Sequence, residues 1–396
     1  MKKKNVAILI PKLAGGGAER VASNLSIYLD EEKFNKYVIV YDSNEQTYDY
    51  GGKLIDLNAK AINNPIGKIY NLFKRVMKMR KFKKENNIDV TISLLSGPNL
   101  VNILSKKDDK VFVSVRNFIS KSAKGFYGNI YKFSINNLYN KADKVISVSK
   151  AIADDLIKNY NIEKNKIKVI YNPYDINKIQ KLSQEKINDE YKEIFEKPTI
   201  INMGRLSEQK GQWHLLRAFK KVETEIKDAQ LVILGKGELE KYLKKLANDL
   251  ELSERVHFLG FQNNPFKYIA NSDLYVFPSL FEGFPNALVE AMACKISVLS
   301  ADCKSGPREI LAPDTNINKK INDIKYAKYG VLFPVLNNKK YSDLDGISKN
   351  EEKLSEIIIK FMKDKVLRKK YKKLAYSRVD NFSFKNIIKL WEKEIS

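Results

Sequence analysis

Short apolar runs recur along the first half of the chain, and each is followed by a stretch with helical periodicity. The runs are VAILI (6–10), YVIVY (37–41), VTISLL (90–95), VFVSV (111–115), VISVS (145–149) and IKVIY (167–171). Runs that are apolar on both strand faces are typical of parallel sheets that helices cover on both sides. The pattern therefore predicts an α/β domain with a parallel sheet.

The pattern breaks at residues 172–197, which are polar and charged with a proline near each end, and then starts again. The second series is TIINM (199–203), LVIL (231–234), VHFLG (256–260), LYVF (274–277), ISVLS (296–300) and GVLF (330–333). We therefore expect an α/β chain of two doubly wound, Rossmann-like parallel-sheet domains facing each other across a cleft. The predicted boundaries are 1–175, a linker at 176–197, 198–375, and a C-terminal helix at 376–396 that packs toward the first domain.

Composition adds a formal net charge of +24, which favours anionic partners such as nucleic acid, acidic lipid or a phosphorylated substrate. A nucleotide bias of the genome, which enriches the chain in Lys, explains the charge equally well. Cys294 and Cys303 have no metal-ligand spacing around them, so we expect neither disulfides nor a metal site. No run of about 18 apolar residues occurs, and residues 6–10 are expected to form a strand rather than a signal peptide, which predicts a cytoplasmic protein.

Three glycine-containing loops follow predicted strands, where parallel sheets bind their ligands. Gly15, Gly16 and Gly17 precede a helix and would allow an anion to approach its exposed N–H groups. In the second domain, Arg205 and Lys210 bracket a loop at the equivalent place, and a guanidinium with an ammonium could hold a pyrophosphate without metal. The turn at Gly235 would suit a nucleoside. Each loop is also compatible with an ordinary turn.

The segment NSDLYVFPSLFEGFPNALVEAMAC (271–294) places two carboxylates after a strand. Pro278 and Pro285 restrict the loop, and Asn286 stands where a helix would be capped. The first amides of that helix could face a phosphate, while the carboxylate of Glu290, one turn later, could accept hydrogen bonds from a ribose diol.

These motifs together resemble the retaining glycosyltransferases of the GT-B fold, in the family-four group of bacterial surface-polysaccharide enzymes. The resemblance covers nearly the whole chain. It rests on GGGAER (15–20), ISVSKAIADDL (146–156), IYNP (170–173), GRLSEQKG (204–211), LGKGEL (234–239), HFLGF (257–261) and FPSLFEGFPNALVEAMAC (277–294).

The resemblance implies a role for each motif. Glu282 would be the first glutamate of the E-x7-E motif, near the donor sugar, and Glu290 the second, at the ribose. Arg205 and Lys210 would hold the diphosphate and, with Glu282, form the catalytic set. The remaining donor-site candidates are Gly15, Gly16, Gly17, Gly235, Gly283, Phe284, Pro285, Asn286, Ala287 and Leu288. Transfer would retain the anomeric configuration, giving an α-linkage without a dedicated base or a metal cofactor.

The first domain would then bind the acceptor, with Glu19, Arg20, Arg116 and Asn117 as candidates. Many relatives place a His near the last two positions, whereas this chain has no His before His214. This departure leaves the role of Arg116 open.

The segment SADCKSGPREIL (300–311) is similar to that of enzymes extending lipid-diphosphate-linked oligosaccharides. A UDP-linked hexose or N-acetylhexosamine is the expected donor, and a lipid-linked or cell-surface glycan the acceptor. Residues 68–84 predict a basic amphipathic helix, which could contact an anionic membrane surface on the inner face of the plasma membrane or pack on the first sheet.

Four alternatives remain: a nucleotide-sugar epimerase, a phosphorylase, an inactive relative of the same fold, and a nucleic-acid-binding protein. A nucleotide-sugar epimerase on the same fold would need acid and base side chains that the motifs do not identify. A nucleic-acid-binding protein would explain the charge but not the phosphate loops, and no nucleic-acid motif occurs, so we expect no nucleic-acid partner.

Overall fold

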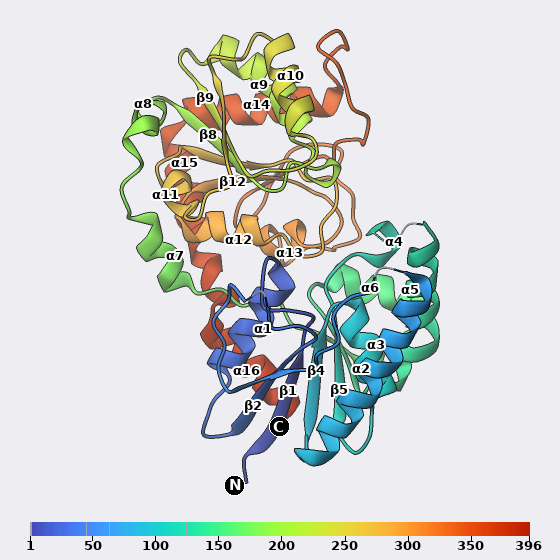
Figure 1. Ribbon diagram of the computed structural model, residues 1–396. Helices are drawn as coiled ribbons and strands as arrows, with labels where there is room; N and C mark the ends of the chain where they lie inside the picture. The colour runs from blue at the N-terminus through green and yellow to red at the C-terminus, as the bar shows by residue number, and fades with distance from the viewer. Residues whose placement is uncertain (1, 45, 63, 123–124) are drawn as a thin grey trace. The chain divides into compact units, whose positions relative to one another are not determined.

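The computed structural model describes residues 2–44, 46–62, 64–122 and 125–396. The chain forms two compact units: residues 1–173 with 384–396, and residues 174–383. Figure 1 follows both along the chain. Residues 176–197, expected as a linker, are part of the second unit and carry helices α7 (Ile176–Ser183) and α8 (Lys192–Phe195).

The first unit is built on a parallel sheet of seven strands in the order β3-β2-β1-β4-β5-β6-β7. The strands are β1 (Lys4–Leu9), β2 (Phe34–Val40), β3 (Lys53–Asp56), β4 (Val90–Leu94), β5 (Lys110–Val115), β6 (Lys144–Ser147) and β7 (Ile167–Val169). The helices are α1 (Gly17–Tyr28), α2 (Pro65–Glu85), α3 (Ser96–Leu104), α4 (Ile119–Ser122), α5 (Gly125–Leu138), α6 (Lys150–Tyr160) and α16 (Phe384–Ile395).

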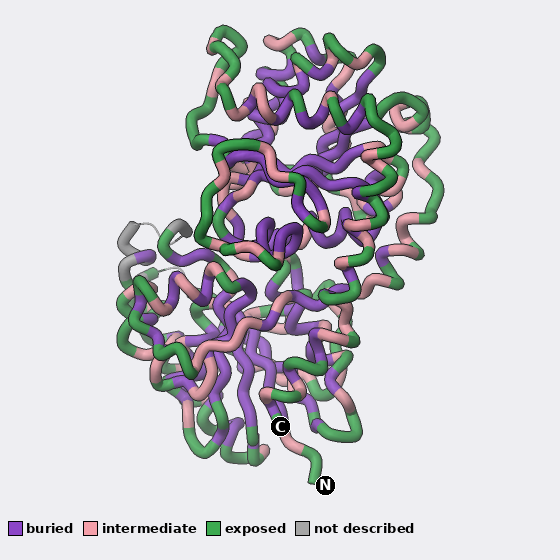
Figure 2. The backbone as a smooth tube through the Cα atoms, turned by 180° about the vertical axis from the view of Figure 1, so that it is seen from behind, coloured by how far each residue is buried: buried purple, intermediate pink, exposed green. Residues whose placement is uncertain are grey.

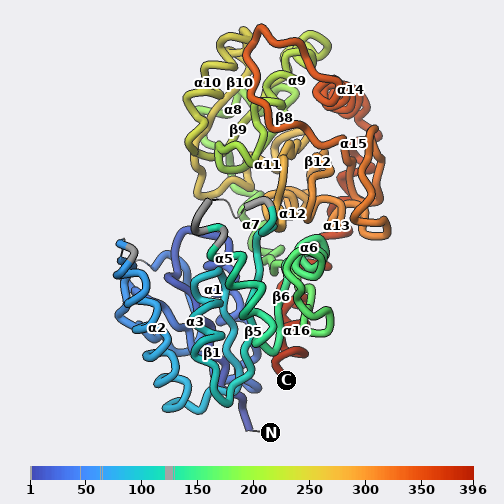
Figure 3. Tube along the Cα trace, turned by 90° about the vertical axis from the view of Figure 1, so that its right-hand side faces the viewer, coloured from blue at the N-terminus to red at the C-terminus, as the bar shows by residue number. Residues whose placement is uncertain are grey.

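Strand β1 shows why helices cover both faces of this sheet. Val6 and Ile8 belong to a core cluster with residues of α1 and α16, whereas Ala7 and Leu9 belong to a cluster with residues of α2. Successive side chains of a strand point to opposite faces, so a strand that is apolar throughout needs a helical layer on each side. Figure 3 shows α2 and α16 on opposite sides of the sheet. Trp391 of α16 is buried in the first of these clusters.

The second unit repeats this architecture with the strand order β10-β9-β8-β11-β12-β14-β13. Its strands are β8 (Thr199–Met203), β9 (Gln230–Leu234), β10 (Val256–Gly260), β11 (Leu274–Phe277), β12 (Ser297–Ala301), β13 (Lys325–Tyr326) and β14 (Val331–Phe333), and β13 pairs antiparallel. The other helices are α9 (Gln212–Glu225), α10 (Glu240–Asp249), α11 (Phe266–Ala270), α12 (Asn286–Ala293), α13 (Pro307–Leu311), α14 (Lys349–Lys363) and α15 (Lys365–Val379).

The core of the second unit lies between its sheet and helices α9, α10 and α14. Figure 1 shows these helices on one side of the sheet, with α11 and α12 on the other. Local signals set the helix ends: Ser348 and Glu351 form a capping box that starts α14. Figure 2 shows the strands of both units as buried and the loops that join them as largely exposed. GT-B proteins have this pair of parallel α/β domains, so the fold class expected from the sequence is confirmed.

Candidate active site

Four loops at the carboxyl ends of neighbouring strands form the candidate donor site in the second unit. They follow β8, β9, β11 and β12, which lie in the order β9-β8-β11-β12 within the sheet. All four strands run parallel, so their following loops meet along one edge. Residues 72 positions apart in the sequence, such as Lys210 and Glu282, thereby become neighbours.

Lys210 and Glu282 form an ion pair that joins the loops after β8 and β11. The Lys210 Nζ lies 2.7 Å from Glu282 Oε1, and the two side chains are 20% and 6% exposed. Gln209 Nε2 donates to Glu282 Oε2 at 3.2 Å and to the Phe281 carbonyl at 2.9 Å. The Glu282 carboxylate is thus held by a charge on one oxygen and an amide donor on the other.

Arg205 has a different partner. Its guanidinium pairs with Glu238 at 3.1 Å, and both side chains are largely exposed. Glu238 belongs to the loop after β9, so the pair joins the two glycine-containing loops. The structure therefore brings Lys210 together with Glu282, and pairs Arg205 with a carboxylate that the sequence did not single out.

Glycines permit close backbone packing in these loops. Gly235 has a φ of +131°, and a Cβ there would lie 2.0 Å from the Gly204 carbonyl oxygen. Gly211 has a φ of +62°, and a Cβ there would lie 2.7 Å from the Pro278 carbonyl oxygen. A side chain at either position would move the loop that carries Arg205 and Lys210.

The segment 283–288 forms the entry to α12. The helix begins at Asn286 with Pro285 as its N-cap, so the expectation that Asn286 caps the helix is wrong. No side chain caps this end, because Pro285 carries no side-chain acceptor. Gly283, Phe284 and Pro285 thus lie in the loop, and Asn286, Ala287 and Leu288 form the first turn.

The loop after β12 supports this entry. The Ser305 hydroxyl donates to the Gly283 carbonyl. Gly306 has a φ of +96°, and a Cβ there would lie 2.1 Å from Pro285 Cδ. These two residues lie within SADCKSGPREIL (300–311), which thereby fixes the shape of the candidate phosphate loop.

Glu290 is buried on α12, with 9% of its surface exposed. Burial raises the pKa of the Tyr275 phenol well above its ordinary value, and the nearby Glu290 carboxylate raises it further. Burial and the same carboxylate also raise the pKa of the Cys294 thiol. Both neighbours therefore stay neutral near neutral pH.

The candidates of the first unit lie at the carboxyl ends of its strands. Gly15 has a φ of +85°, Gly16 caps α1, and Gly17 is its first residue. A Cβ on Gly16 would lie 2.2 Å from Glu19 Oε2, so this carboxylate lies against the glycine turn. The guanidinium of Arg20 lies 5.7 Å from the centre of the Tyr48 ring.

Arg116 and Asn117 follow β5 in the same unit. An Arg116 Nη donates to Asn172 Oδ1 at 2.6 Å, and Asn117 is exposed. This contact joins the loops after β5 and β7, across the intervening β6. The hydrogen bond to Asn172 therefore fixes the Arg116 guanidinium at the carboxyl ends of the strands, where an acceptor is expected.

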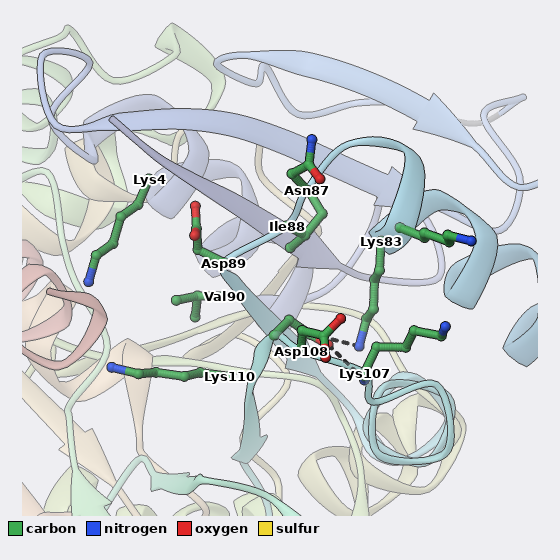
Figure 4. Close-up of a pocket in the computed structure, with 11 residues that line it drawn as sticks. Lys4, Lys83, Asn87, Ile88, Asp89, Val90, Lys107, Asp108 and Lys110 are labelled. Carbon is green, nitrogen blue, oxygen red and sulfur yellow. Dashed lines mark hydrogen bonds and ion pairs between the residues drawn. The ribbon is translucent and has the colours of Figure 1, made fainter. Parts of the chain in front are cut away.

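A pocket of about 420 Å³ lies elsewhere, at the amino ends of β1, β4 and β5 (Figure 4). Lys4 and Lys110 lie on one side of it, and Lys83 and Lys107 on the other. Lys83 is buried and forms an ion pair with Asp109 at 2.9 Å. Burial lowers the pKa of Lys83 to about 8, against the opposing effect of Asp109. The ion pair of Lys83 and Asp109 is part of the protein interior. The pocket lies at the amino ends of the strands, whereas the candidate site loops follow their carboxyl ends.

Helix α2 has two apolar faces. Val76, Met79 and Phe82 are buried against the first sheet. This agrees with the sequence-based alternative that residues 68–84 pack on that sheet. A second row is exposed, at the helical spacing i, i+3, i+4, i+7, i+11: Ile66, Ile69, Tyr70, Phe73 and Met77. We call this row the α2 stripe. Among the described residues, no helix is long and apolar enough to cross a membrane, and no three His, Cys, Asp or Glu side chains gather as a metal site.

Sequence reasoning missed Gln209, Glu238 and the pair Ser305–Gly306. Gln209 and Glu238 lie inside motifs that were recognised, so their position in GRLSEQKG and LGKGEL was the available signal. Ser305 and Gly306 act through contacts with a segment about 20 residues away, which no local pattern reveals.

Two family models match the chain. A family model described as "Glycosyltransferase Family 4" matches residues 15–178, and one described as "Glycosyl transferases group 1" matches residues 183–378. The chain is 37% identical over 354 residues to the glycosyltransferase MJ1059 of Methanocaldococcus jannaschii, which covers 86% of this chain and 87% of the relative.

A second relative is the N-acetylgalactosamine-N,N'-diacetylbacillosaminyl-diphospho-undecaprenol 4-alpha-N-acetylgalactosaminyltransferase of Campylobacter jejuni. It is 31% identical over 386 residues, which is 96% of each chain. Among solved structures, a glycosyltransferase from Rickettsia africae superposes with a TM-score of 0.76 at 18% identity, over 100% of this chain and 98% of its own. Anabaena Alr3699/HepE in complex with UDP and glucose gives 0.75 at 18% identity, over 99% of each chain.

Proposed function

The chain belongs to the family 4 glycosyltransferases, and from this premise we propose that it transfers a hexose or N-acetylhexosamine from a UDP-sugar to a lipid-diphosphate-linked glycan. The ion pair between Lys210 and Glu282 carries the proposal, because it joins the loop expected at the diphosphate to the loop expected at the sugar. The acceptor class is supported by the name of the Campylobacter relative, whose substrate is a diphospho-undecaprenol-linked sugar.

The donor would lie along the four loops of the second unit. The first turn of α12 offers backbone N–H groups to a phosphate, and the positive end of the helix favours its charge. Arg205 and Lys210 add two cations. Glu290, one turn into α12, would accept hydrogen bonds from the ribose hydroxyls, and the Gly235 turn would lie against the base.

Charge separation at the leaving diphosphate is the main demand of the reaction. As the bond from the anomeric carbon to the phosphate oxygen breaks, negative charge develops on that oxygen. Lys210, which pairs with Glu282, would share its ammonium between this oxygen and that carboxylate, and Glu282 would lie near the positively charged sugar ring. A leaving phosphate that accepts the acceptor's hydroxyl proton on the same face gives retention and an α-linkage.

The acceptor would be bound by the first unit. Arg116 and Arg20 supply guanidinium groups near its carboxyl strand ends, and such forks suit a diphosphate. Glu19 and Asn117 offer hydrogen-bonding groups for sugar hydroxyls.

We further propose that the α2 stripe contacts an anionic membrane, where a lipid-linked acceptor would be found. Ile66, Ile69 and Phe73 are 82%, 73% and 65% exposed, an unusual exposure for three large apolar side chains on one helix face. Lys68, Lys81 and Lys84 are exposed on the same helix, and each cation near an anionic surface adds about 1 kcal/mol.

Binding to vesicles tests the membrane proposal. Phe73→Ser should weaken sedimentation with phosphatidylglycerol vesicles, whereas Val366→Ser, which removes an apolar side chain of 79% exposure from α15, should not. Equal loss in both variants, or no binding by the wild type, contradicts a specific contact through α2.

Calorimetry with UDP, GDP and ADP tests the donor, and incubation with UDP-sugars and a polyprenyl-diphosphate glycan tests transfer. The expected result is binding of UDP, and a product whose new bond is α by NMR. A β-linked product would overturn retention. Epimerised UDP-sugar formed without acceptor would favour an epimerase instead.

A further inference from the structure

The chain passes between its two units at two places, before Tyr174 and after Ser383. Residues at both places contact the entry of α12, at Phe284 and Asn286. The second unit begins at Tyr174 and ends at Ser383. The Tyr174 N–H donates to the Phe382 carbonyl at 2.9 Å, and Tyr174 forms a parallel bridge with Ser383. The first and last residues of this unit are therefore bound to each other.

Tyr174 also reaches the first residue of α12. Its hydroxyl donates to Asn286 Oδ1 at 2.6 Å, and Tyr174 is 7% exposed. A short hydrogen bond from a buried hydroxyl fixes which side of the amide faces the tyrosine, and so turns the Asn286 amide nitrogen away from it. Asn286 begins the helical turn whose backbone groups would contact the donor phosphate.

Phe382 makes the matching contact from the second crossing. Its ring is fully buried and lies 5.7 Å from the Phe284 ring at an angle of 62°. The guanidinium of Arg378 covers Phe382 at 4.9 Å and donates to the carbonyls of Glu309 and Ile310 at 3.3 Å. The crossing is thereby anchored to α13, which follows the loop that supports Pro285.

We propose that Tyr174 is a positioning residue for the donor diphosphate and acts through Asn286. The inference rests on the proposed function, because it takes the entry of α12 as the phosphate site. Tyr174 contacts Asn286 and Phe382 contacts Phe284, so both residues support the entry of α12. The geometry of the phosphate contacts would therefore depend on these two residues, which lie where the chain crosses between the units. Binding of a nucleoside diphosphate should in turn steady both crossings.

Tyr174→Phe removes only the hydroxyl, and Tyr268→Phe is the matched control. Tyr268 is fully buried in the same unit, and its hydroxyl makes no hydrogen bond with any described residue. We expect Tyr174→Phe to weaken UDP binding about three- to tenfold and to raise the KM of the donor by the same factor, as for loss of one hydrogen bond. The KM of the acceptor should not change, and Tyr268→Phe should leave all three values at those of the wild type.

Hydrogen exchange provides the second measurement. UDP should slow exchange of the Tyr174 and Ser383 amides in the wild type, and do so less in Tyr174→Phe. A purely structural tyrosine would lower Tm without changing UDP affinity or this protection, and that outcome overturns the proposal. If the wild type binds UDP and Tyr174→Phe binds it equally well, the positioning role alone fails. If the wild type binds no nucleoside diphosphate, the proposed function fails as well.

Discussion

Replacement of Lys210 by Met tests the central ion pair, because it keeps the apolar stem and removes the ammonium. At 2.7 Å the gross attraction to Glu282 is about 6 kcal/mol for an effective dielectric constant of about 20. Desolvation of both groups offsets much of this attraction. Removing one partner leaves the other buried and unpaired, however, and Glu282 is only 6% exposed. Since Lys210 itself is one-fifth exposed, we expect a loss near the lower end of the usual range, about 3 kcal/mol.

Tryptophan fluorescence can follow the second unit alone. The chain has two tryptophans, and Trp213 is buried in the second unit whereas Trp391 belongs to the first. Denaturant unfolding in a Trp391→Phe background would therefore report on Trp213. The double variant Lys210→Met/Glu282→Gln should recover part of the loss, because it leaves no unpaired charge. A single Lys210→Met variant within about 0.5 kcal/mol of its background would refute the argument.

Turnover distinguishes the catalytic role from the structural one. If the Lys210 ammonium stabilises the departing diphosphate, Lys210→Met should lower kcat about 10²–10³-fold, with a smaller effect on the KM of the donor. Lys210→Arg keeps the charge and should retain more activity. A folded Lys210→Met enzyme with kcat within about threefold of the wild type would exclude this role.

Four further outcomes follow from the structure. Glu290→Ala should weaken UDP binding about tenfold through the lost ribose contact, as calorimetry would show. Gly235→Ala should destabilise the second unit by more than about 2 kcal/mol in denaturant unfolding, because its Cβ would meet a carbonyl oxygen at 2.0 Å, whereas Gly97→Ala meets nothing within 4 Å and should be tolerated. Burial lowers the pKa of Lys83 to about 8 from 10.5, so the unfolded chain binds this proton more tightly. Between pH 8 and 10.5, the free energy of unfolding of the first unit should then rise by about 3 kcal/mol relative to Lys83→Met. If Arg205 and Lys210 supply the cations at the diphosphate, as proposed, EDTA should leave transfer unchanged.

The periodicity of the chain was sufficient to predict both sheets. Twelve apolar runs were expected as strands, and each contains or overlaps a strand of the structure. Two strands of the structure were not predicted: β3 (Lys53–Asp56) and β13 (Lys325–Tyr326). Both are short, lie at sheet edges and carry exposed or half-buried side chains, so they lack an apolar signal. The loops expected at the carboxyl ends of the strands follow from the parallel order alone.

By itself, the sequence determined the fold class, the loops that carry charged and glycine residues, and the family. Those properties depend on local spacing and on short motifs. Only the tertiary structure decided the partners: Lys210 with Glu282, Arg205 with Glu238, and Tyr174 with Asn286. It also decided which face of α2 is buried and which is exposed. The physical reason is that such contacts join residues between 33 and 112 positions apart, and their geometry is set by sheet order and packing, which no local pattern specifies.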